Sequence, residues 1–188
     1  PCYRTCYFYS QINSSIMKIL ADSGSTKTSW AFIENDKVIS TKNTSGFNPY
    51  YYDDEILLEI IDNELLPKLK DYFIAEIYFY GAGCSTKENC LRVKNALSSR
   101  FKNATILINH DLAGAATALL KNQKGIACIL GTGSNSCLWD GKSVISNVPS
   151  LGYMLGDEGS GTYIGMKILK GILENKAPKE IHDKFLKE

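Results

Sequence analysis

Hydrophobic and polar positions alternate with two different periods along the chain from Met17 onward. Short runs rich in β-branched and aromatic residues at 18–21, 28–34 and 37–41 are separated by polar turn residues, so they predict three antiparallel strands. Between 54 and 69, apolar residues recur at helical spacing with charged residues between them, so this segment predicts a helix.

The next segments continue the alternation of strands and helices. Apolar runs at 77–80 and 105–109 predict two more strands, of which 105–109 is expected to be buried. A helix is predicted from Ser85 to about 101, opened by a Ser-x-x-Glu capping-box pattern, and another over 113–120. A strand reached through a helical crossover normally pairs parallel to an earlier strand, so both new strands are expected to extend the sheet in parallel.

The strand–turn–strand–hairpin–strand pattern then occurs a second time. Strands are predicted at 125–130, 136–139 and 143–147, with a Gly/Ser/Thr turn after the first, and a helix over 160–175. Cys128 is expected in a buried strand. A repeated supersecondary unit predicts two lobes of similar build.

We therefore expect three parts in the chain. Residues 1–16 show neither a helical nor a strand period that extends past Met17, so we expect a non-native or disordered arm. Residues 17–121 predict a complete first lobe and 122–188 the start of a second, which needs roughly another hundred residues by analogy with the first. The chain is expected to be truncated at its C-terminus, and its second lobe to expose an apolar face.

Composition excludes several classes of protein. Of 188 residues, 44% are hydrophobic and 22% charged, which is ordinary for a globular protein. The net charge of +1 gives no electrostatic signal for nucleic acid or an anionic membrane surface, and no apolar run is long enough to span a membrane. The six cysteines are irregularly spaced, which favours reduced thiols in a cytoplasmic protein.

Two Gly/Ser/Thr turns carry candidate chemistry. The segments Asp22–Thr28 and Gly131–Asn135 each follow a predicted strand, and such turns expose backbone N–H groups that bind phosphate. Asp22 adds a carboxylate suited to Mg²⁺. Either turn alone is also compatible with an ordinary hairpin loop, and neither matches the Walker A pattern. Their equivalent places in a repeated unit favour a clamp for a polyphosphate.

Two acidic positions add to this picture. Asp111 lies where the strand 105–109 gives way to a helix, so it either caps the helix or takes a proton from a hydroxyl that attacks phosphorus. In the segment 152–161, Asp157 and Glu158 stand among four glycines. These two acids either bind substrate hydroxyls or a metal, or are solvated at a glycine-rich helix start.

The order of these motifs resembles that of N-acetylglucosamine kinases of the BadF/BadG/BcrA/BcrD ATPase family, in the sugar kinase, heat-shock ATPase and actin superfamily. The resemblance covers about residues 17–175 and implies an α/β fold of ribonuclease-H-like (actin-like ATPase) lobes, with a mixed sheet flanked by helices and an incomplete second lobe. The motifs that carry it are Asp22-x-Gly24-x-Thr26-x-Thr28, Asp111 followed by Ala113-Gly114-Ala115-Ala116, Gly131-Thr132-Gly133-Ser134-Asn135 and Gly156-Asp157-Glu158-Gly159-Ser160.

The resemblance also implies a reaction and its residues. The expected activity is phosphorylation of an amino-sugar hydroxyl, most directly that of N-acetylglucosamine, with ATP and Mg²⁺ as cofactors and Asp111 as the catalytic base. Asp22 is expected to face Mg²⁺. The expected phosphate loops are Ser23, Gly24, Ser25, Thr26, Lys27 and Thr28, and Gly131, Thr132, Gly133 and Ser134; the expected sugar contacts are Asn48, Tyr50, Asp111, Thr132 and Asp157.

Alternatives remain open at this point. Pro149-Ser150-Leu151-Gly152 stands where many N-acetylglucosamine kinases have Gly-Gly-Trp-Gly, which weakens the choice of this sugar. Within the family, the alternative is an ATPase activator of a radical acyl-CoA dehydratase or reductase, which holds an iron–sulfur cluster with cysteines. A non-catalytic sugar-binding fragment and a kinase-like transcriptional regulator are the others. A homodimer is an open expectation; nucleic-acid and membrane partners are not expected.

Overall fold

The computed structural model describes residues 16–69, 72–148 and 150–185, which form two compact units that divide between Gly114 and Ala115. The lobe boundary expected at 121–122 stays a prediction. Of the arm expected over 1–16, only Ile16 lies within the described residues, where it opens the first strand.

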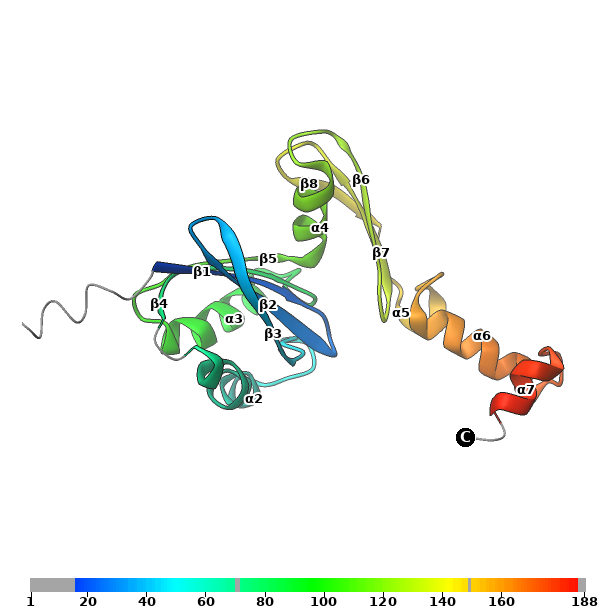
Figure 1. The fold of residues 1–188 in the computed structure, drawn as a ribbon. Coiled ribbons are helices and arrows are strands. Elements are labelled where there is room, and N and C mark those ends of the chain that lie inside the picture. The colour runs from blue at the N-terminus through cyan, green and yellow to red at the C-terminus, as the bar shows by residue number, and fades with distance from the viewer. Residues whose placement is uncertain (1–15, 70–71, 149, 186–188) are drawn as a thin grey trace, which may run out of the picture. The chain divides into compact units, whose positions relative to one another are not determined.

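The first unit is built on a five-stranded mixed sheet (Figure 1). The order is β3-β2-β1-β4-β5, with β1, β2 and β3 antiparallel and β4 and β5 parallel to β1. This confirms the predicted antiparallel meander and its parallel extension. The strands are β1 (Ile16–Ser23), β2 (Lys27–Glu34), β3 (Lys37–Ser45), β4 (Phe73–Gly81) and β5 (Thr105–His110).

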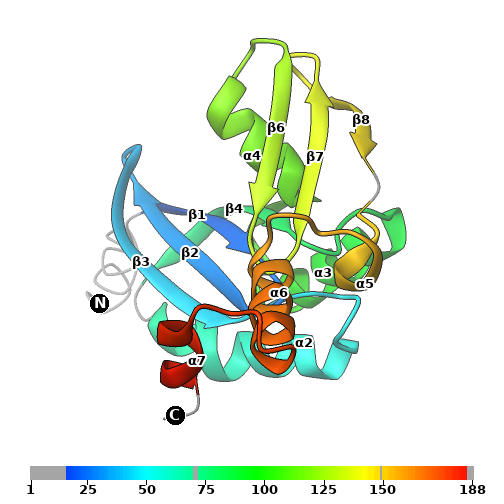
Figure 2. The same cartoon turned by 90° about the vertical axis from the view of Figure 1, so that its right-hand side faces the viewer.

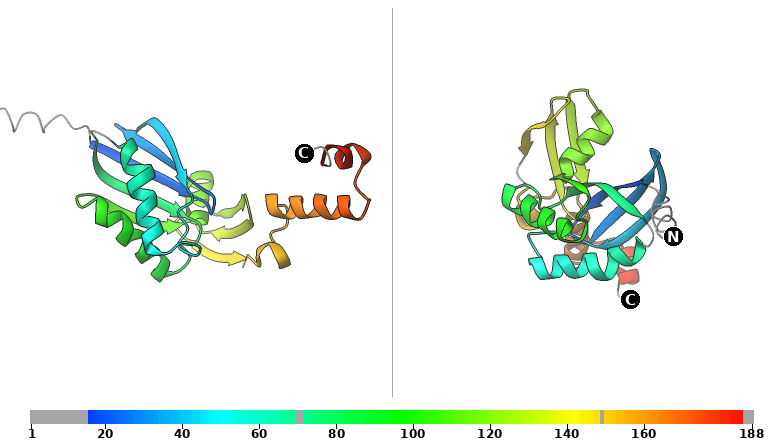
Figure 3. Two further views of the ribbon diagram at one scale, coloured as in Figure 1. Left: turned by 90° about the horizontal axis from the view of Figure 1, so that it is seen from below. Right: turned by 90° about the vertical axis from the view of Figure 1, so that its left-hand side faces the viewer.

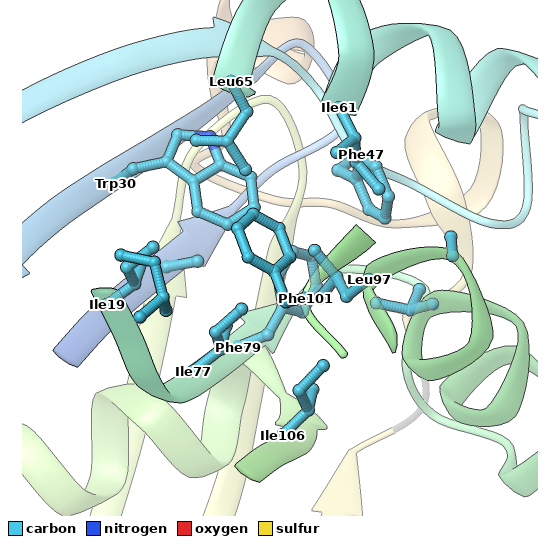
Figure 4. Close-up of a cluster of buried hydrophobic side chains, with 14 of the residues drawn as sticks. Ile19, Trp30, Phe47, Ile61, Leu65, Ile77, Phe79, Leu97, Phe101 and Ile106 are labelled. Carbon is cyan, nitrogen blue, oxygen red and sulfur yellow. The ribbon is translucent and has the colours of Figure 1, made fainter. Parts of the chain in front are cut away.

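Two helical segments lie side by side on one face of this sheet (Figure 3). The first is α2 (Asp54–Ile60), which continues as the π-helical turn η1 (Ile61–Leu65) and the 3₁₀ turn η2 (Leu66–Lys68). The second is α3 (Lys87–Arg100). Both supply apolar side chains that meet those of the strands in one core, around Trp30, Phe47 and Phe79 (Figure 4).

The alternation of side chains along β1 decides which residues face this core. Met17, Ile19 and Ala21 are fully buried against the helices. Successive side chains of a strand point to opposite faces, so Asp22 lies on the other face of the sheet. The candidate carboxylate is thereby kept out of the core.

Two predictions for the first unit were wrong in detail. The side chain that caps α3 belongs to Thr86, which accepts a hydrogen bond from the Asn89 amide at 3.1 Å, and not to Ser85. Ser85 and Thr86 are adjacent and both residue types cap helices, so the Ser-x-x-Glu pattern did not identify the observed cap. Strand β5 is not buried throughout: only Ile106 is, because the helices cover one face of the sheet.

The second unit contains a three-stranded antiparallel sheet and three short helices after it (Figure 2). Helix α4 (Asp111–Leu120) leads from β5 into this unit. The strands are β6 (Gly125–Leu130), β7 (Ser134–Trp139) and β8 (Val144–Val148), and the helices α5 (Gly152–Leu155), α6 (Gly161–Leu173) and α7 (Lys179–Phe185). Three antiparallel strands and α6 were predicted, whereas α5 and α7 were not.

Much apolar surface of the second unit is exposed, as predicted. Ile126 and Leu130 of β6 are 70% and 69% exposed, and Ala127 is the only buried residue of that strand. Cys128 is exposed, so its predicted burial was wrong: the apolar run does form a strand, but no described element covers that position. Among the described residues, no helix is both long and apolar enough to cross a membrane.

Candidate active site

The first Gly/Ser/Thr turn is a tight connection between β1 and β2. The amide of Gly24 donates to the carbonyl of Lys27 at 2.9 Å, which closes the turn. Ser23 and Thr28 are buried at its base, where their hydroxyl oxygens lie 2.7 Å apart. These two predicted phosphate-loop side chains are therefore committed to holding the turn, and the part open to a ligand is the backbone at its tip.

Backbone amides at the tip are available as donors. Within the described ranges, no acceptor is found for the amides of Ser25 and Thr26. The turn is held from below by Gly46, whose amide donates to the Thr26 carbonyl at 3.1 Å. Free N–H groups in a small concavity suit an anion such as phosphate.

A loop between β3 and α2 places the two predicted sugar contacts beside this turn. Asn48 is buried; its side-chain amide donates to Ser25 Oγ at 2.9 Å, and its side-chain oxygen accepts from the Tyr50 amide at 2.9 Å. Tyr50 is exposed, with its hydroxyl 3.0 Å from Ser85 Oγ. Asn48 therefore links the turn to the loop, and Tyr50 is the more accessible of the two.

The strand register assembles a polar row on the open face of the sheet. Ser29, Asp22, Tyr80 and Asn109 are successive cross-strand neighbours in β2, β1, β4 and β5. The first turn of α4 packs on this row, because a Cβ added at Gly114 would lie 2.8 Å from the Tyr80 ring. This packing brings the start of α4 to the same face as Asp22.

Asp22 and Asp111 consequently interact as a pair of like charges. The pKa of Asp22 is raised, first because neighbouring atoms desolvate its carboxylate and second because Asp111 is a negative charge nearby; Lys27 opposes the rise. Asp22 is nevertheless exposed to solvent. Asp22 lies near the end of β1, and Asp111 follows β5, which is separated from β1 by β4. Two carboxylates close enough to repel each other are the kind of site that a cation stabilises.

The local contacts of Asp111 involve the start of α4. Its Oδ1 accepts from the Leu112 amide at 2.8 Å and lies 3.0 Å from Nδ1 of His110. Its side chain is 21% exposed. The carboxylate thus supports the helix start and is also open to a ligand, so both interpretations of this residue stay compatible with its geometry.

The second turn belongs to the other unit, where helix α6 holds it. The amides of Gly161 and Thr162 donate to the carbonyls of Gly131 and Thr132 at 2.9 and 3.3 Å. Within the part of the chain that the structure describes, the amides of Thr132 and Gly133 have no acceptor. This turn therefore also presents backbone donors to a ligand.

Asp157 lies next to this second turn. Its Oδ1 accepts from the Ser134 amide at 3.1 Å and from Ser150 Oγ at 3.0 Å, and its backbone has a positive φ of 59°. A Cβ added at Gly133 would lie 3.0 Å from the Asp157 carboxylate. The predicted sugar-binding acid therefore braces the turn, and its role toward a sugar stays a prediction.

The donor set of the first unit fits Mg²⁺ shared with a nucleotide. Mg²⁺ usually takes one or two protein carboxylates and completes its shell with phosphates and water. Asp22 would supply such a carboxylate, with the negative charge of Asp111 nearby. The described residues contain no group of three His, Cys, Asp or Glu side chains that could hold a metal ion, so an all-protein cage is not found among them.

The cysteines of the described residues are free thiols. Cys84 is buried beside Cys90, and burial raises the pKa of Cys84 to about 12. Cys90 donates to the Cys84 carbonyl at 3.3 Å. A buried protonated thiol is a poor iron ligand, because the thiolate is the form that binds metal.

Some residues of this site were not predicted from the sequence. Gly46 has no room for a side chain, since an added Cβ would lie 2.2 Å from the Ser25 carbonyl oxygen. Tyr80 and Asn109 join the row only through strand register. The glycine in Gly46-Phe47-Asn48 was a usable hint, whereas the row could not be found without knowing the strand order.

A scan against family models and a search of curated proteins each gave no match. Solved structures do match. MreB5 of Spiroplasma citri superposes with a TM-score of 0.54 at 9% identity, over 72% of this chain and 52% of that one. Together with the mixed sheet and its helices, this defines the protein as one with the actin-like ATPase fold, as predicted.

Two further solved structures carry the name "putative N-acetylglucosamine kinase". The one from Porphyromonas gingivalis has a TM-score of 0.87 and 40% identity over 91% of this chain. The one from Chromobacterium violaceum has a TM-score of 0.64 and 18% identity over 93% of this chain and 64% of that one. The chain is thus similar to both proteins over about nine tenths of its own length, and it spans 61% of the length of the Porphyromonas relative.

Proposed function

We propose that this protein phosphorylates a hydroxyl of an amino sugar with ATP, and that N-acetylglucosamine is the first sugar to test. The observation that carries the proposal is the pairing of Asp22 and Asp111 beside the donor-rich turn after β1. Phosphoryl transfer needs a general base, a cation and amide donors in one place. The 40% identity to the Porphyromonas protein supports the same function.

In this proposal each group of the first unit has a role. The carboxylate of Asp111 accepts the proton of the sugar hydroxyl while that oxygen bonds to the γ-phosphorus of ATP. The bond from this phosphorus to the bridging oxygen breaks, and ADP leaves. Asp22 would hold Mg²⁺, which neutralises phosphate charge when bound. Asn48 and Tyr50 orient the sugar.

The two Gly/Ser/Thr turns are proposed to hold the nucleotide phosphates. The free amides of Ser25 and Thr26, and those of Thr132 and Gly133, are the donors. Nucleotide binding is supported by the solved MreB5 structure, which is bound to ADP and shares the fold.

We also propose a cytoplasmic location for the protein, which the free thiols among the described cysteines support.

Substitution of Asp111 tests the proposal. Asp111→Asn keeps a side-chain oxygen that can accept from the helix start, so stability should change by under about 1 kcal/mol. Sugar-dependent ADP release should fall by roughly 10²–10⁴-fold, mainly in kcat, because the base acts in the transition state. ADP release and thermal melting are measured on the wild-type chain and on both Asp111→Asn and Asp111→Ala.

A purely capping role predicts the opposite pattern. Asp111→Ala would then lower the melting temperature while turnover per folded molecule stayed intact. Near-normal sugar kinase activity of Asp111→Asn would end the assignment of Asp111 as the base.

A further inference from the structure

Arg92 on helix α3 makes three hydrogen bonds to a single segment of chain. Its Nε donates to Asp54 Oδ1 at 2.7 Å, Nη1 to the Pro49 carbonyl at 2.6 Å and Nη2 to the Tyr52 carbonyl at 2.8 Å. The acceptors all lie between 49 and 54. This segment continues directly from Asn48 and contains Tyr50.

The two carbonyl contacts lie on either side of Tyr50 and Tyr51. Inside the segment, the amides of Tyr51 and Tyr52 donate to the Asn48 carbonyl at 3.1 and 3.2 Å. The segment is thus a short turn, closed from within by Asn48 and from outside by the guanidinium. The Arg92 side chain is 26% exposed, so water competes only in part for these bonds.

The geometry requires arginine specifically. A guanidinium presents its donors in a rigid planar fork, so one side chain can reach two carbonyls and a carboxylate at once. A lysine ammonium keeps the charge but is a point donor on a flexible stem. Bonds from a charged donor are stronger than neutral ones, which suits a group that fixes backbone.

We propose that Arg92 is a positioning residue that holds the Asn48–Tyr52 turn in the shape that contacts the sugar. This inference rests on the proposed function, because it assumes that Asn48 and Tyr50 touch the substrate. Arg92 itself reaches only the backbone of the turn and Asp54, and so acts through the turn.

The same helix provides a matched control. Arg100 donates from Nε and Nη2 to the two carboxylate oxygens of Asp62, at 2.6 and 2.7 Å. It also joins α3 to the helical segment after α2, but its hydrogen bonds to the described residues do not include the Asn48–Tyr52 turn. Arg100→Ala therefore removes an arginine ion pair from α3 without touching the proposed role.

The experiment compares wild type, Arg92→Ala, Arg92→Lys and Arg100→Ala in the full chain. Amide hydrogen exchange of Tyr51 and Tyr52 reports the order of the turn, and calorimetry with N-acetylglucosamine reports sugar affinity. In Arg92→Ala we expect both amides to exchange faster and sugar affinity to fall, each by about ten- to hundredfold, the weight of one or two charge-assisted hydrogen bonds. Arg92→Lys should recover only part of either loss.

Activity adds a second readout. Arg92→Ala should raise KM for the sugar much more than it lowers kcat, since positioning of the substrate is lost and the base is kept. Arg100→Ala should match wild type in exchange, affinity and KM. A general loss of helix stability would instead move both variants together.

Three results would overturn the proposal: unchanged exchange of Tyr51 and Tyr52 in Arg92→Ala, equal effects in Arg100→Ala, or full recovery by Arg92→Lys. If the wild-type chain binds no sugar, the proposed function fails, and with it the sugar role of Arg92. Hydrogen exchange would in that case still decide whether Arg92 orders the turn.

Discussion

In each unit the first three strands are successive and antiparallel, but the sheet of the first unit is much better buried than that of the second. In the first, β1 alternates buried and open positions, and the helices bury Met17, Ile19 and Ala21 completely. In the second, Ala127 is the only buried residue of β6, and Ile126 and Leu130 stay largely exposed. A repeated strand pattern therefore predicts the pairing of strands, whereas burial depends on which helices are present.

The two Gly/Ser/Thr turns also differ in the groups that hold them in place. Both leave two amides without an acceptor among the described residues. The first turn is held by buried hydroxyls and by Gly46, inside a well-packed unit. The second is held by the start of α6 and by the Asp157 carboxylate, on a unit with little core. Two turns with similar free amides thus rest on supports that differ in packing.

The largest expected effect comes from the core of the first unit. Phe79→Ala should lower the free energy of unfolding by about 3–5 kcal/mol, because the ring is fully buried between Trp30 and Phe47. Leu130→Ala, at an exposed position of β6, should change stability by no more than about 0.5 kcal/mol.

The two tryptophans make this comparison measurable unit by unit. Trp30 is buried in the first unit and Trp139 in the second. Urea unfolding is followed by tryptophan fluorescence. In a Trp139→Phe background the signal reports unfolding of the first unit, and in a Trp30→Phe background it reports unfolding of the second. Equal costs for Phe79→Ala and Leu130→Ala would contradict the difference in packing.

A middle-sized effect is expected where the first turn meets Gly46. An added Cβ there would approach the Ser25 carbonyl oxygen to 2.2 Å, so Gly46→Ala must displace the turn, at a cost of about 1–3 kcal/mol. Gly131 of the second turn has nothing within 4 Å of such a Cβ, so Gly131→Ala should be near neutral. Unfolding of the unit that contains each site is the measurement, and a neutral Gly46→Ala would show that the first turn is not braced there.

The smallest effect is a pH dependence at the end of β3. Glu64 accepts from the amide and the hydroxyl of Ser45, both at 2.7 Å, and these bonds lower the pKa of Glu64 below its ordinary 4.5. A lowered folded-state pKa stabilises the fold above that ordinary value, and the gain is lost as the pH falls through the folded-state pKa. Glu64→Gln should therefore cost under about 1 kcal/mol near neutral pH, since the bonds are exposed.

That difference between wild type and Glu64→Gln should shrink as the pH falls below about 4.5. Unfolding midpoints of both proteins across this range are the measurement. A difference that stays constant with pH would exclude the charged form of Glu64 as its source.

Much of the fold could be predicted from local pattern. The strand at 125–130 was predicted with its observed bounds, and Ser160 caps α6 as the start of the predicted helix. Helices α5 and α7 were missed because they are short and lie in segments rich in glycine or charge. The cap of α3 was displaced by one residue, because Ser85 and Thr86 are chemically alike.

The site was less predictable than the fold. Asp22 and Asp111 stood out as polar residues at the ends of predicted elements, and Asn48 was indicated by the resemblance to N-acetylglucosamine kinases. Their neighbours did not, because Tyr80 and Asn109 meet Asp22 only through the order of the strands. The role of Arg92 could not be predicted either, because its carbonyl acceptors lie about forty residues earlier in the chain. Contacts between distant segments need the tertiary structure.

Transfer of phosphate from ATP to a sugar hydroxyl, which we propose for the carboxylates of the first unit, can be observed directly by ³¹P NMR. The wild-type chain is incubated with ATP, Mg²⁺ and N-acetylglucosamine. We expect a new phosphomonoester signal that grows in step with ADP and is absent without the sugar. ADP released with an equal amount of inorganic phosphate, at a rate that the sugar does not change, would contradict the proposed reaction.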